Sequence, residues 1–427
     1  MDRFVIEGSH KLSGTIEPRG SKNAALPCVA ATLLTSEAVT LSRLPAIQDV
    51  LIMQQLVAQL GGTVERLAHD SVQFQSQTIY HDEADRTLSQ KIRASFLLAG
   101  PLLARCGQAT LPRPGGDRIG RRPLDTHIEA FQQMGVEVEV RPDSYRLVAP
   151  EGLRAADIFL TEMSVMATEN VIMAAALTSG ISHISNAASE PHVQDLCHLL
   201  VAMGAEIEGI GSSNLTIHGK TQLHGATFEI GPDYLEVGSF IGLAAATGSE
   251  LLIRRCRPEQ HRVTAIYMGR LGVRWEVRGD DIWVPGNQQL VVQEDLHGAV
   301  TKIDDAPWPG FPADLVSTAL VVATQAQGTI LIHEKMFESR LFWVDKLIGM
   351  GARIILCDPH RAVVVGPAPL YGQRLTSPDI RAGMALVIAA LCAEGQSIIE
   401  NVEQIDRGYE ALDERLRALG ARIERES

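Results

Sequence analysis

The densest group of chemically useful residues lies in one segment, RPGGDRIGRRPLD, which runs from Arg113 to Asp125. It combines glycines and arginines with a single internal acid, Asp117. Glycine lets backbone N–H groups approach an anion, and guanidinium groups match phosphate oxygens in geometry. A helix predicted to follow Pro123 would add the favourable field of its N-terminus. The segment predicts a phosphate-binding site, with a solvated basic loop as the alternative.

Other charged residues recur close to the predicted starts of helices. Each of them alone would suit a helix cap or a surface ion pair, but several together could hold a multiply charged phosphate ester. Asp314 follows the proline-rich turn of APWPGFPADL, where a carboxylate could point into a cleft. The remaining candidates are Lys22 and Asn23 in GSKNAAL, Arg93 in KIRAS, Arg340 in FESR, Arg381 in PDIRA and Arg407 in QIDRGYE.

The elements that would position these residues form a sixfold repeat. An apolar residue, a glycine and a strand-like run recur after each amphipathic helical pattern, and glycine there is typical of a left-handed helix cap. Alanine-rich helical segments precede these patterns. The sequence therefore predicts an α/β fold of six units of about 71 residues, each a helix, a strand, a helix and strands. The repeated glycines are Gly61, Gly135, Gly204, Gly272, Gly351 and Gly420.

Composition narrows the classes of protein that fit. The 427 residues hold 38 Lys and Arg against 51 Asp and Glu, which gives a net charge of −13 and argues against a general binder of nucleic acid or anionic membranes. The six cysteines form no C-x-x-C pair, and the sequence has neither a signal peptide nor an apolar run of membrane-spanning length. We expect a soluble cytoplasmic protein that needs no metal or cofactor.

The motifs GSKNAALP, PGGDRIGRRPLDTHI, SVMATENVIMAAA, FPADL, FESR and IDRGYEALDERLRALGA resemble the enolpyruvyl transferase family, essentially from end to end. The resemblance implies two globular domains joined by a double crossover. Each would contain three βαβαββ-type repeats, arranged as an inside-out α/β barrel with pseudo-threefold symmetry. One domain would comprise residues 22–230 and the other residues 1–21 and 231–427, with the active site in the cleft between them.

The resemblance also implies a reaction with two small-molecule substrates. The enolpyruvyl group of phosphoenolpyruvate would pass to the 3-hydroxyl of UDP-N-acetylglucosamine, with release of phosphate, by addition and elimination through a tetrahedral ketal. This is the first committed step of peptidoglycan precursor synthesis, and so serves cell-wall formation, cell shape and cell division. Two alternatives stay open: a paralogue that acts on another nucleotide, and a catalytically idle paralogue that binds a nucleotide sugar.

The resemblance assigns roles residue by residue. Asp314 would be the general base, Asp117 the general acid, and Lys22 a catalytic cation. Phosphoenolpyruvate would be bound by Lys22, Arg93, Arg122, Arg340, Arg381 and Arg407. The UDP-sugar would contact Asn23, Arg93, Arg122, Pro123, Leu124, Asp125, Thr126, Ser164, Val165, Met166, Asp314 and Met336.

Several positions depart from the family pattern. Most members have a cysteine in place of Asp117, and the epoxide fosfomycin alkylates that cysteine. A carboxylate is a weaker soft nucleophile than a thiolate, so we expect a fosfomycin-insensitive enzyme whose Asp117 pKa is raised by burial on closure. Departures that bear on the acceptor are Leu97, Met166, Ala313 and Gln404.

Overall fold

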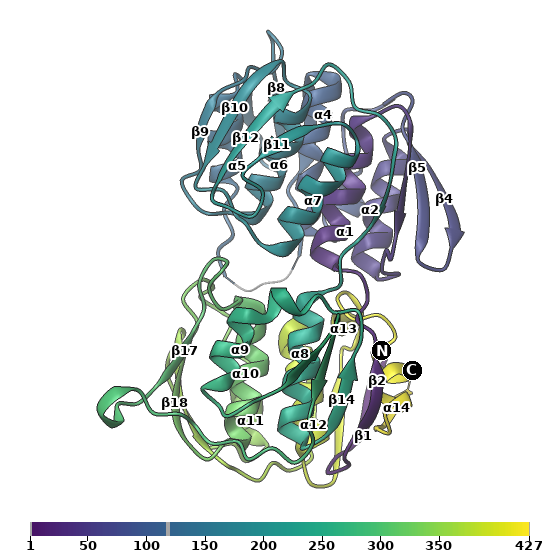
Figure 1. The fold of residues 1–427 in the computed structure, drawn as a ribbon. Helices are drawn as coiled ribbons and strands as arrows, with labels where there is room; N and C mark the ends of the chain where they lie inside the picture. Colours follow the sequence, from purple (N-terminus) through teal and green to yellow (C-terminus); the bar gives the residue numbers. More distant parts are fainter. Residues whose placement is uncertain (1, 117–119, 427) are drawn as a thin grey trace. The chain divides into compact units, whose positions relative to one another are not determined.

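The computed structural model describes residues 2–116 and 120–426. They form two compact units: a terminal unit of residues 2–19, 120–121 and 232–426, and a middle unit of residues 20–116 and 122–231. Both chain ends lie in the terminal unit, beside β1 and α14 (Figure 1). The middle unit is thus an insertion in the terminal unit's chain. Asp117, the expected general acid, lies outside the described residues.

The terminal unit contains three four-stranded sheets of one topology. In each, an edge strand runs parallel to the second strand, and the other neighbours pair antiparallel. The sheets have the orders β2-β14-β16-β15, β17-β18-β20-β19 and β21-β22-β1-β23. Their strands are β1 (Arg3–Glu7), β2 (Ser13–Ile16), β14 (Glu250–Ile253), β15 (Glu276–Arg278), β16 (Asp281–Val284), β17 (Lys302–Asp304), β18 (Gly328–His333), β19 (Ile354–Asp358), β20 (Arg361–Gly366), β21 (Arg374–Thr376), β22 (Gln396–Glu400) and β23 (Arg422–Glu426).

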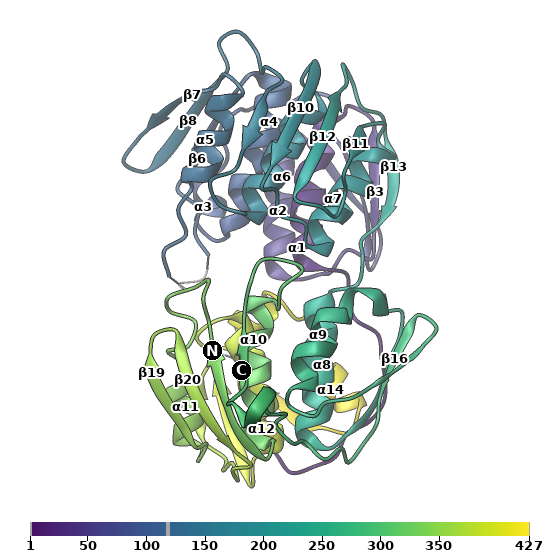
Figure 2. The ribbon, with the colours of Figure 1, turned by 60° about the vertical axis from the view of Figure 1, so that its left-hand side comes forward.

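The middle unit repeats this topology, with its strands on the outside of its helices (Figure 2). Its sheets have the orders β13-β3-β5-β4, β9-β10-β12-β11 and β6-β8-β7; in the last, a parallel bridge between Glu83 and Thr110 takes the place of the edge strand. The strands are β3 (Ala38–Ser42), β4 (Thr63–Ala68), β5 (Ser71–Gln75), β6 (Gln108–Pro112), β7 (Glu137–Val140), β8 (Ser144–Val148), β9 (Asp157–Phe159), β10 (Gly180–Ser185), β11 (Glu206–Glu208), β12 (Asn214–Gly219) and β13 (Ala226–Glu229).

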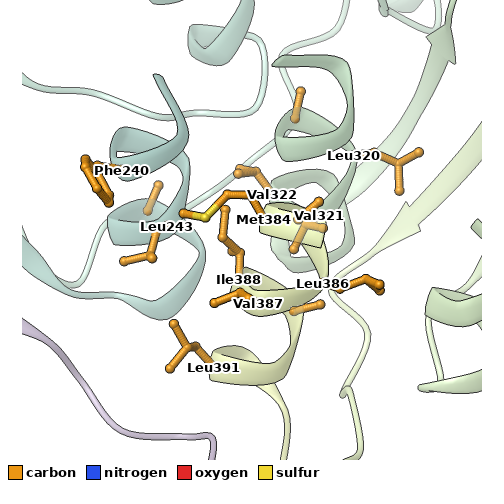
Figure 3. Packing of buried hydrophobic residues seen from close by; sticks show 14 of the residues in the cluster. Phe240, Leu243, Leu320, Val321, Val322, Met384, Leu386, Val387, Ile388 and Leu391 are labelled. Carbon is orange, nitrogen blue, oxygen red and sulfur yellow. The ribbon is translucent and has the colours of Figure 1, made fainter. Parts of the chain in front are cut away.

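Six helices fill the two cores, and five of them, all but α4, coincide at least in part with the predicted alanine-rich segments. The six helices are α1 (Lys22–Ala31), α4 (Ala99–Cys106), α6 (Val165–Ala176), α8 (Tyr234–Thr247), α10 (Ala313–Gln325) and α12 (Ile380–Cys392). In the terminal unit α8, α10 and α12 pack on one another, and Met384 of α12 points toward Leu243 of α8 (Figure 3). Small residues let these helices approach closely: a Cβ on Gly242 would lie 2.3 Å from Cγ2 of Thr318.

The six repeated glycines all have positive φ, between 83° and 115°. Each ends a helix and leads into the outer strand of a sheet, so the predicted left-handed caps are confirmed. The capped helices are α2 (Gln48–Gln59), α5 (Asp125–Gln133), α7 (Pro191–Ala202), α9 (Arg262–Gly269), α11 (Val344–Gly349) and α14 (Leu412–Ala418). The short helices α3 (Arg86–Ser89), α13 (Glu403–Asp406) and the 3₁₀ helix η2 (Arg93–Leu98) complete the elements used below.

The repeats match the expected βαβαββ pattern, but in two of them one strand comes from a distant part of the chain. β1, at the start of the chain, pairs with β22 and β23 near its end, and so completes the last repeat of the terminal unit. β13 likewise returns to pair with β3 in the first repeat of the middle unit. Within the part of the chain that the structure describes, no helix combines the length and apolar character needed to cross a membrane.

Candidate active site

Asp314 lies in the first turn of α10, in the terminal unit, and forms ion pairs with two arginines. Arg340 donates from Nη2 to Oδ1, and Arg381 donates from Nε to Oδ2 over 2.9 Å. Each arginine is only 5% exposed, whereas a quarter of the Asp314 side chain is accessible. The predicted residues Asp314, Arg340 and Arg381 are therefore brought together, with the carboxylate at the accessible side of the cluster.

The two arginines control the charge of Asp314. Burial raises the pKa of this carboxyl, but the charges and hydrogen bonds of Arg340 and Arg381 outweigh burial and hold the pKa well below its usual range. Asp314 is therefore a carboxylate that accepts a proton poorly while both arginines contact it. A role as general base requires the arginines to transfer their bonds to another anion.

Arg381 is fixed by the local structure at the start of α12. Asp379 caps the helix by accepting the N–H groups of Arg381 and Ala382 over 2.8 and 2.9 Å. On the other side, Nη1 of Arg381 donates to the hydroxyl of Tyr409 over 3.1 Å, and Tyr409 also contacts Ser239. Because these partners constrain both ends of the side chain, Arg381 is a preorganised cation.

Two further predicted residues of the terminal unit lie on surface segments. Arg407 follows α13 directly and donates to the side chain of Gln404 over 2.9 Å. Gln404 is one of the departures from the family pattern, and its amide oxygen supplies this contact. Met336 is 41% exposed, on the loop that leads to Arg340.

Lys22, one of the predicted cations of the middle unit, opens α1 and pairs with Asp49 over 2.7 Å. The pair is buried, because the two side chains are 9% and 6% exposed. Ser21 caps α1 through the N–H of Ala24. Asn23, next to Lys22, is half-buried. A buried lysine that opens a helix adds its charge to the field of the helix N-terminus, an arrangement suited to an anionic ligand.

Arg93, on η2, reaches the segment expected to bind phosphate. Its Nη2 donates to the backbone carbonyls of Arg122 and Pro123, the latter over 3.2 Å. Burial, followed by the charge of Arg122, lowers the pKa of Arg93 to about 10. These bonds hold Arg93, Arg122 and Pro123 together just before α5.

The remaining residues predicted for the UDP-sugar lie at two helix starts that pack together, those of α5 and α6. Leu124 and Thr126 are buried and Asp125 is exposed; the hydroxyl of Thr126 lies 3.2 Å from that of Thr161. Ser164 caps α6 by accepting the N–H of Ala167, and Val165 and Met166 form the first turn. Such a pair of helix starts offers backbone N–H groups to an anion.

Sequence reasoning missed three residues that hold the site in the middle unit: Asp49, His127 and Asn170. The amide of Asn170 lies 3.1 Å from Nδ1 of His127 and also binds the carbonyl of Phe96. Burial, with the charge of Arg93, lowers the pKa of His127 to about 3, so this ring is neutral. Acidic Asp49 in the first turn of α2 was a usable signal, but its partner could not be read from the sequence.

Comparison of the whole chain with known proteins identifies its family. The family model described as EPSP synthase (3-phosphoshikimate 1-carboxyvinyltransferase) matches residues 6–416. The chain belongs to the EPSP synthase family. Within the family it is similar to the UDP-N-acetylglucosamine 1-carboxyvinyltransferases of Treponema denticola, at 54% identity over 99% of both chains, and of Bradyrhizobium diazoefficiens, at 54% over 99% of this chain and 98% of that one. The enzyme of that name from Bacteroides thetaiotaomicron is 49% identical over 100% of both chains.

Solved structures of family members share the fold. The enolpyruvyl transferase NikO from Streptomyces tendae superposes with a TM-score of 0.87 at 23% identity and covers 99% of this chain and 98% of its own. EPSP synthase from Acinetobacter baumannii gives a TM-score of 0.75 at 16% identity over the whole of both chains. At these identities the likeness supports the fold of the family and not a substrate.

Among the described residues, no group of three or more His, Cys, Asp or Glu side chains could hold a metal ion. The terminal unit gathers positive charge at Arg340 and Arg381, and the middle unit gathers it separately at Lys22 and Arg93. These groups can bind phosphate and carboxylate oxygens and stabilise negative charge, as transfer from a phosphate ester requires.

Proposed function

We propose that this protein transfers the enolpyruvyl group of phosphoenolpyruvate to the 3-hydroxyl of UDP-N-acetylglucosamine and releases phosphate. The observation that carries this proposal is the identity of about half of all residues, over the full length, to relatives that bear the name of this activity. The protein would thereby commit the sugar nucleotide to peptidoglycan synthesis, in support of cell shape and division. We propose that it works in the cytoplasm, where both substrates are made.

In the first step the sugar hydroxyl adds to C2 of phosphoenolpyruvate. A C–O bond forms, the double bond is broken, and a proton joins the methylene carbon to give a tetrahedral ketal. Asp314 takes the proton of the hydroxyl, and Asp117 supplies the proton to the methylene. Two carboxyl groups can serve as base and acid when their surroundings separate their pKa values.

Binding of phosphoenolpyruvate prepares Asp314 for this task. Its carboxylate and phosphate groups compete with Asp314 for Arg340 and Arg381, and each bond that moves to the substrate removes one cause of the depressed pKa. The base therefore gains proton affinity once the anionic substrate is in place. Binding of phosphoenolpyruvate before proton transfer suits a preorganised site, because Arg340 and Arg381 then also stabilise the negative charge of the ketal.

In the second step the ketal loses phosphate. The bond from C2 to the phosphate oxygen breaks, the carboxylate of Asp117 takes a proton back from the methyl group, Asp314 gives its proton to the departing phosphate, and the enol ether remains on the sugar. Lys22 and Arg93, with Arg122 and Arg407, bind the charged groups of substrate and product. The bond of Arg93 to the carbonyls before α5 supports this assignment, because it joins the phosphate-binding segment to the UDP-binding helix starts.

Of the departures from the family pattern, Leu97 is the least informative about the acceptor. It is 1% exposed and belongs to the hydrophobic core of the middle unit, so this departure concerns packing. Met166 is only partly buried and opens α6. Met166 is therefore the position at which a different nucleotide would be selected.

Phosphate release tests the proposal and separates the alternatives. Purified protein with phosphoenolpyruvate should liberate phosphate only when UDP-N-acetylglucosamine is added. Release with another nucleotide, but not with this acceptor, would select a paralogue of different specificity. Binding of UDP-N-acetylglucosamine by calorimetry, without release for any acceptor, would select an idle paralogue.

A further inference from the structure

Glu334 is a buried carboxyl group that the proposed mechanism does not use. It directly follows β18, is 0% exposed, and neither of its oxygens accepts a hydrogen bond from a described residue. An ionised carboxylate without donors in such a place would be strongly unfavourable. The charge state of Glu334 therefore needs an explanation.

The groups that face Glu334 come from four elements. Asp305 lies just after β17, Asp314 on α10, and Arg340 on the loop beyond Glu334 itself. His360, between β19 and β20, contacts the backbone of Glu334: Nδ1 lies 2.8 Å from the carbonyl oxygen of Glu334, and the carbonyl of His360 accepts the N–H of Glu334 over 2.8 Å. Burial first, and then the charge of Asp305, raises the pKa of Glu334 to about 9, against the opposing effect of Arg340. Glu334 is thus a neutral carboxylic acid at pH 7.

Asp305 is the hydrogen-bond partner that this proton makes possible. A side-chain hydrogen bond with Asp305 is among the causes of the raised pKa of Glu334, and such a bond needs a proton because two carboxylates can only accept. Asp305 already accepts the backbone N–H groups of Lys335 and, over 3.1 Å, Met336. Because Asp305 already accepts two N–H groups and Glu334 accepts none from a described residue, we assign the shared proton to Glu334, which then donates.

This pair sits at the base of the loop that carries Arg340. The N–H groups bound by Asp305 are those of the first two residues after Glu334, and Arg340 follows four residues beyond Met336 to reach Asp314. Nε of Arg340 is buried without a partner among the described residues, and Nη2 binds Asp314, so the position of the side chain depends on the loop and on Asp314. Ionised Glu334 would repel Asp305 and attract Arg340, and both effects would disturb the loop.

We propose that Glu334 is a positioning residue: as a neutral acid it donates to Asp305, and the pair holds the loop from Lys335 to Arg340 so that Arg340 lies at Asp314. This inference rests on the proposed function, because Arg340 is taken to bind phosphoenolpyruvate. Glu334 itself touches no substrate. Its influence should show in the KM for phosphoenolpyruvate and in the pH dependence of that constant.

The test compares three variants over a pH range. In the wild type, KM for phosphoenolpyruvate should rise several-fold between about pH 8 and about pH 10, as Glu334 ionises. E334Q keeps a neutral donor, so its KM should stay low and lose that rise. E334A removes the donor and should raise KM about tenfold at pH 7, with a smaller change in kcat. Glu250→Gln, at an exposed carboxyl on β14, is the control and should follow the wild type.

An alkaline rise in E334Q equal to that of the wild type, or an unchanged KM in E334A, would overturn the proposal. Circular dichroism of E334A separates a displaced loop from failure to fold, and E334Q, the conservative variant, should keep the low KM that E334A loses.

The protonation state of Glu334 can also be measured without an activity assay. The infrared difference spectrum between wild type and E334Q at pH 7 should contain the carbonyl stretch of a protonated carboxylic acid, lost near about pH 9. Its absence would refute the neutral Glu334 even if the enzyme used another acceptor.

Discussion

Nε of Arg381 donates to Oδ2 of Asp314 over 2.9 Å, although 67 residues separate them in the chain. Because Arg340 occupies the other oxygen, both acceptor atoms of the proposed base are engaged by cations. The pair keeps Asp314 ionised and places it at the accessible edge of the cluster. Asp314 can therefore accept a proton readily only after an anionic substrate has taken over the hydrogen bonds of Arg340 and Arg381.

Replacement of Asp314 by asparagine should lower kcat by about 10²–10⁴-fold, because an amide cannot take the hydroxyl proton. Asparagine also leaves two buried arginines beside a neutral group, so the melting temperature should fall. Phosphate release per folded protein, measured below the thermal transition, separates the two effects. Asp345→Asn, at an exposed carboxyl of α11, is the matched control. Turnover of the Asp314 variant within about tenfold of wild type would exclude the assigned role.

Replacement of Lys22 by methionine should weaken binding of phosphoenolpyruvate by about 2–3 kcal/mol, the size of a contact with a charged group. Lys22→Arg keeps the charge next to Asp49 and should lose less. Isothermal titration with phosphoenolpyruvate measures both variants. Equal affinity for wild type and the methionine variant would place Lys22 outside the phosphoenolpyruvate site and leave it a structural partner of Asp49.

Fosfomycin should cause no time-dependent loss of activity, because residue 117 is an aspartate and not a thiol. Asp117→Cys should make the enzyme sensitive to covalent inactivation, with one fosfomycin added per chain. Mass spectrometry of the treated proteins reads the adduct directly. An adduct on the wild-type protein would show that another group reacts and would refute the expected insensitivity.

His127 should make stability fall in acid. Its folded pKa of about 3 lies below the ordinary value of 6.5, so the unfolded chain binds the extra proton between these values. The free energy of unfolding of the wild type should therefore decrease from pH 6.5 toward pH 3, by up to about 1.4 kcal/mol per pH unit, relative to His127→Asn. Urea unfolding of both proteins at several pH values measures this slope. Parallel curves would mean that the folded protein accepts the proton.

Replacement of Gly242 by alanine should destabilise the terminal unit by about 1–3 kcal/mol, since the new Cβ would overlap Cγ2 of Thr318 on α10. Thr318→Ala in the same chain removes that methyl group and should restore part of the loss. Gly269→Ala is the control, because a Cβ there meets no atom within 4 Å. Thermal melts compare the four proteins, and equal melting temperatures for wild type and Gly242→Ala would contradict close packing of α8 on α10.

The sequence alone determined the repeated elements. The six glycines end helices because a left-handed cap depends on local backbone conformation, and their spacing was visible without a structure. The alanine-rich runs predicted helices because alanine has the highest intrinsic helix propensity. Charge and residue type also pointed to Lys22, Arg340 and Arg381 as anion ligands. For Asp117 the sequence remains the sole source of its proposed role.

The tertiary structure decided which of these residues act on one another. Asp314 meets Arg340 and Arg381 because α8, α10 and α12 pack together, and Lys22 meets Asp49 because α1 packs on α2. Asp305 and Glu334 became a pair only through the parallel pairing of β17 with β18. Pairing between distant segments depends on packing of whole elements, and charge states such as that of Glu334 depend on the burial and neighbours that packing creates.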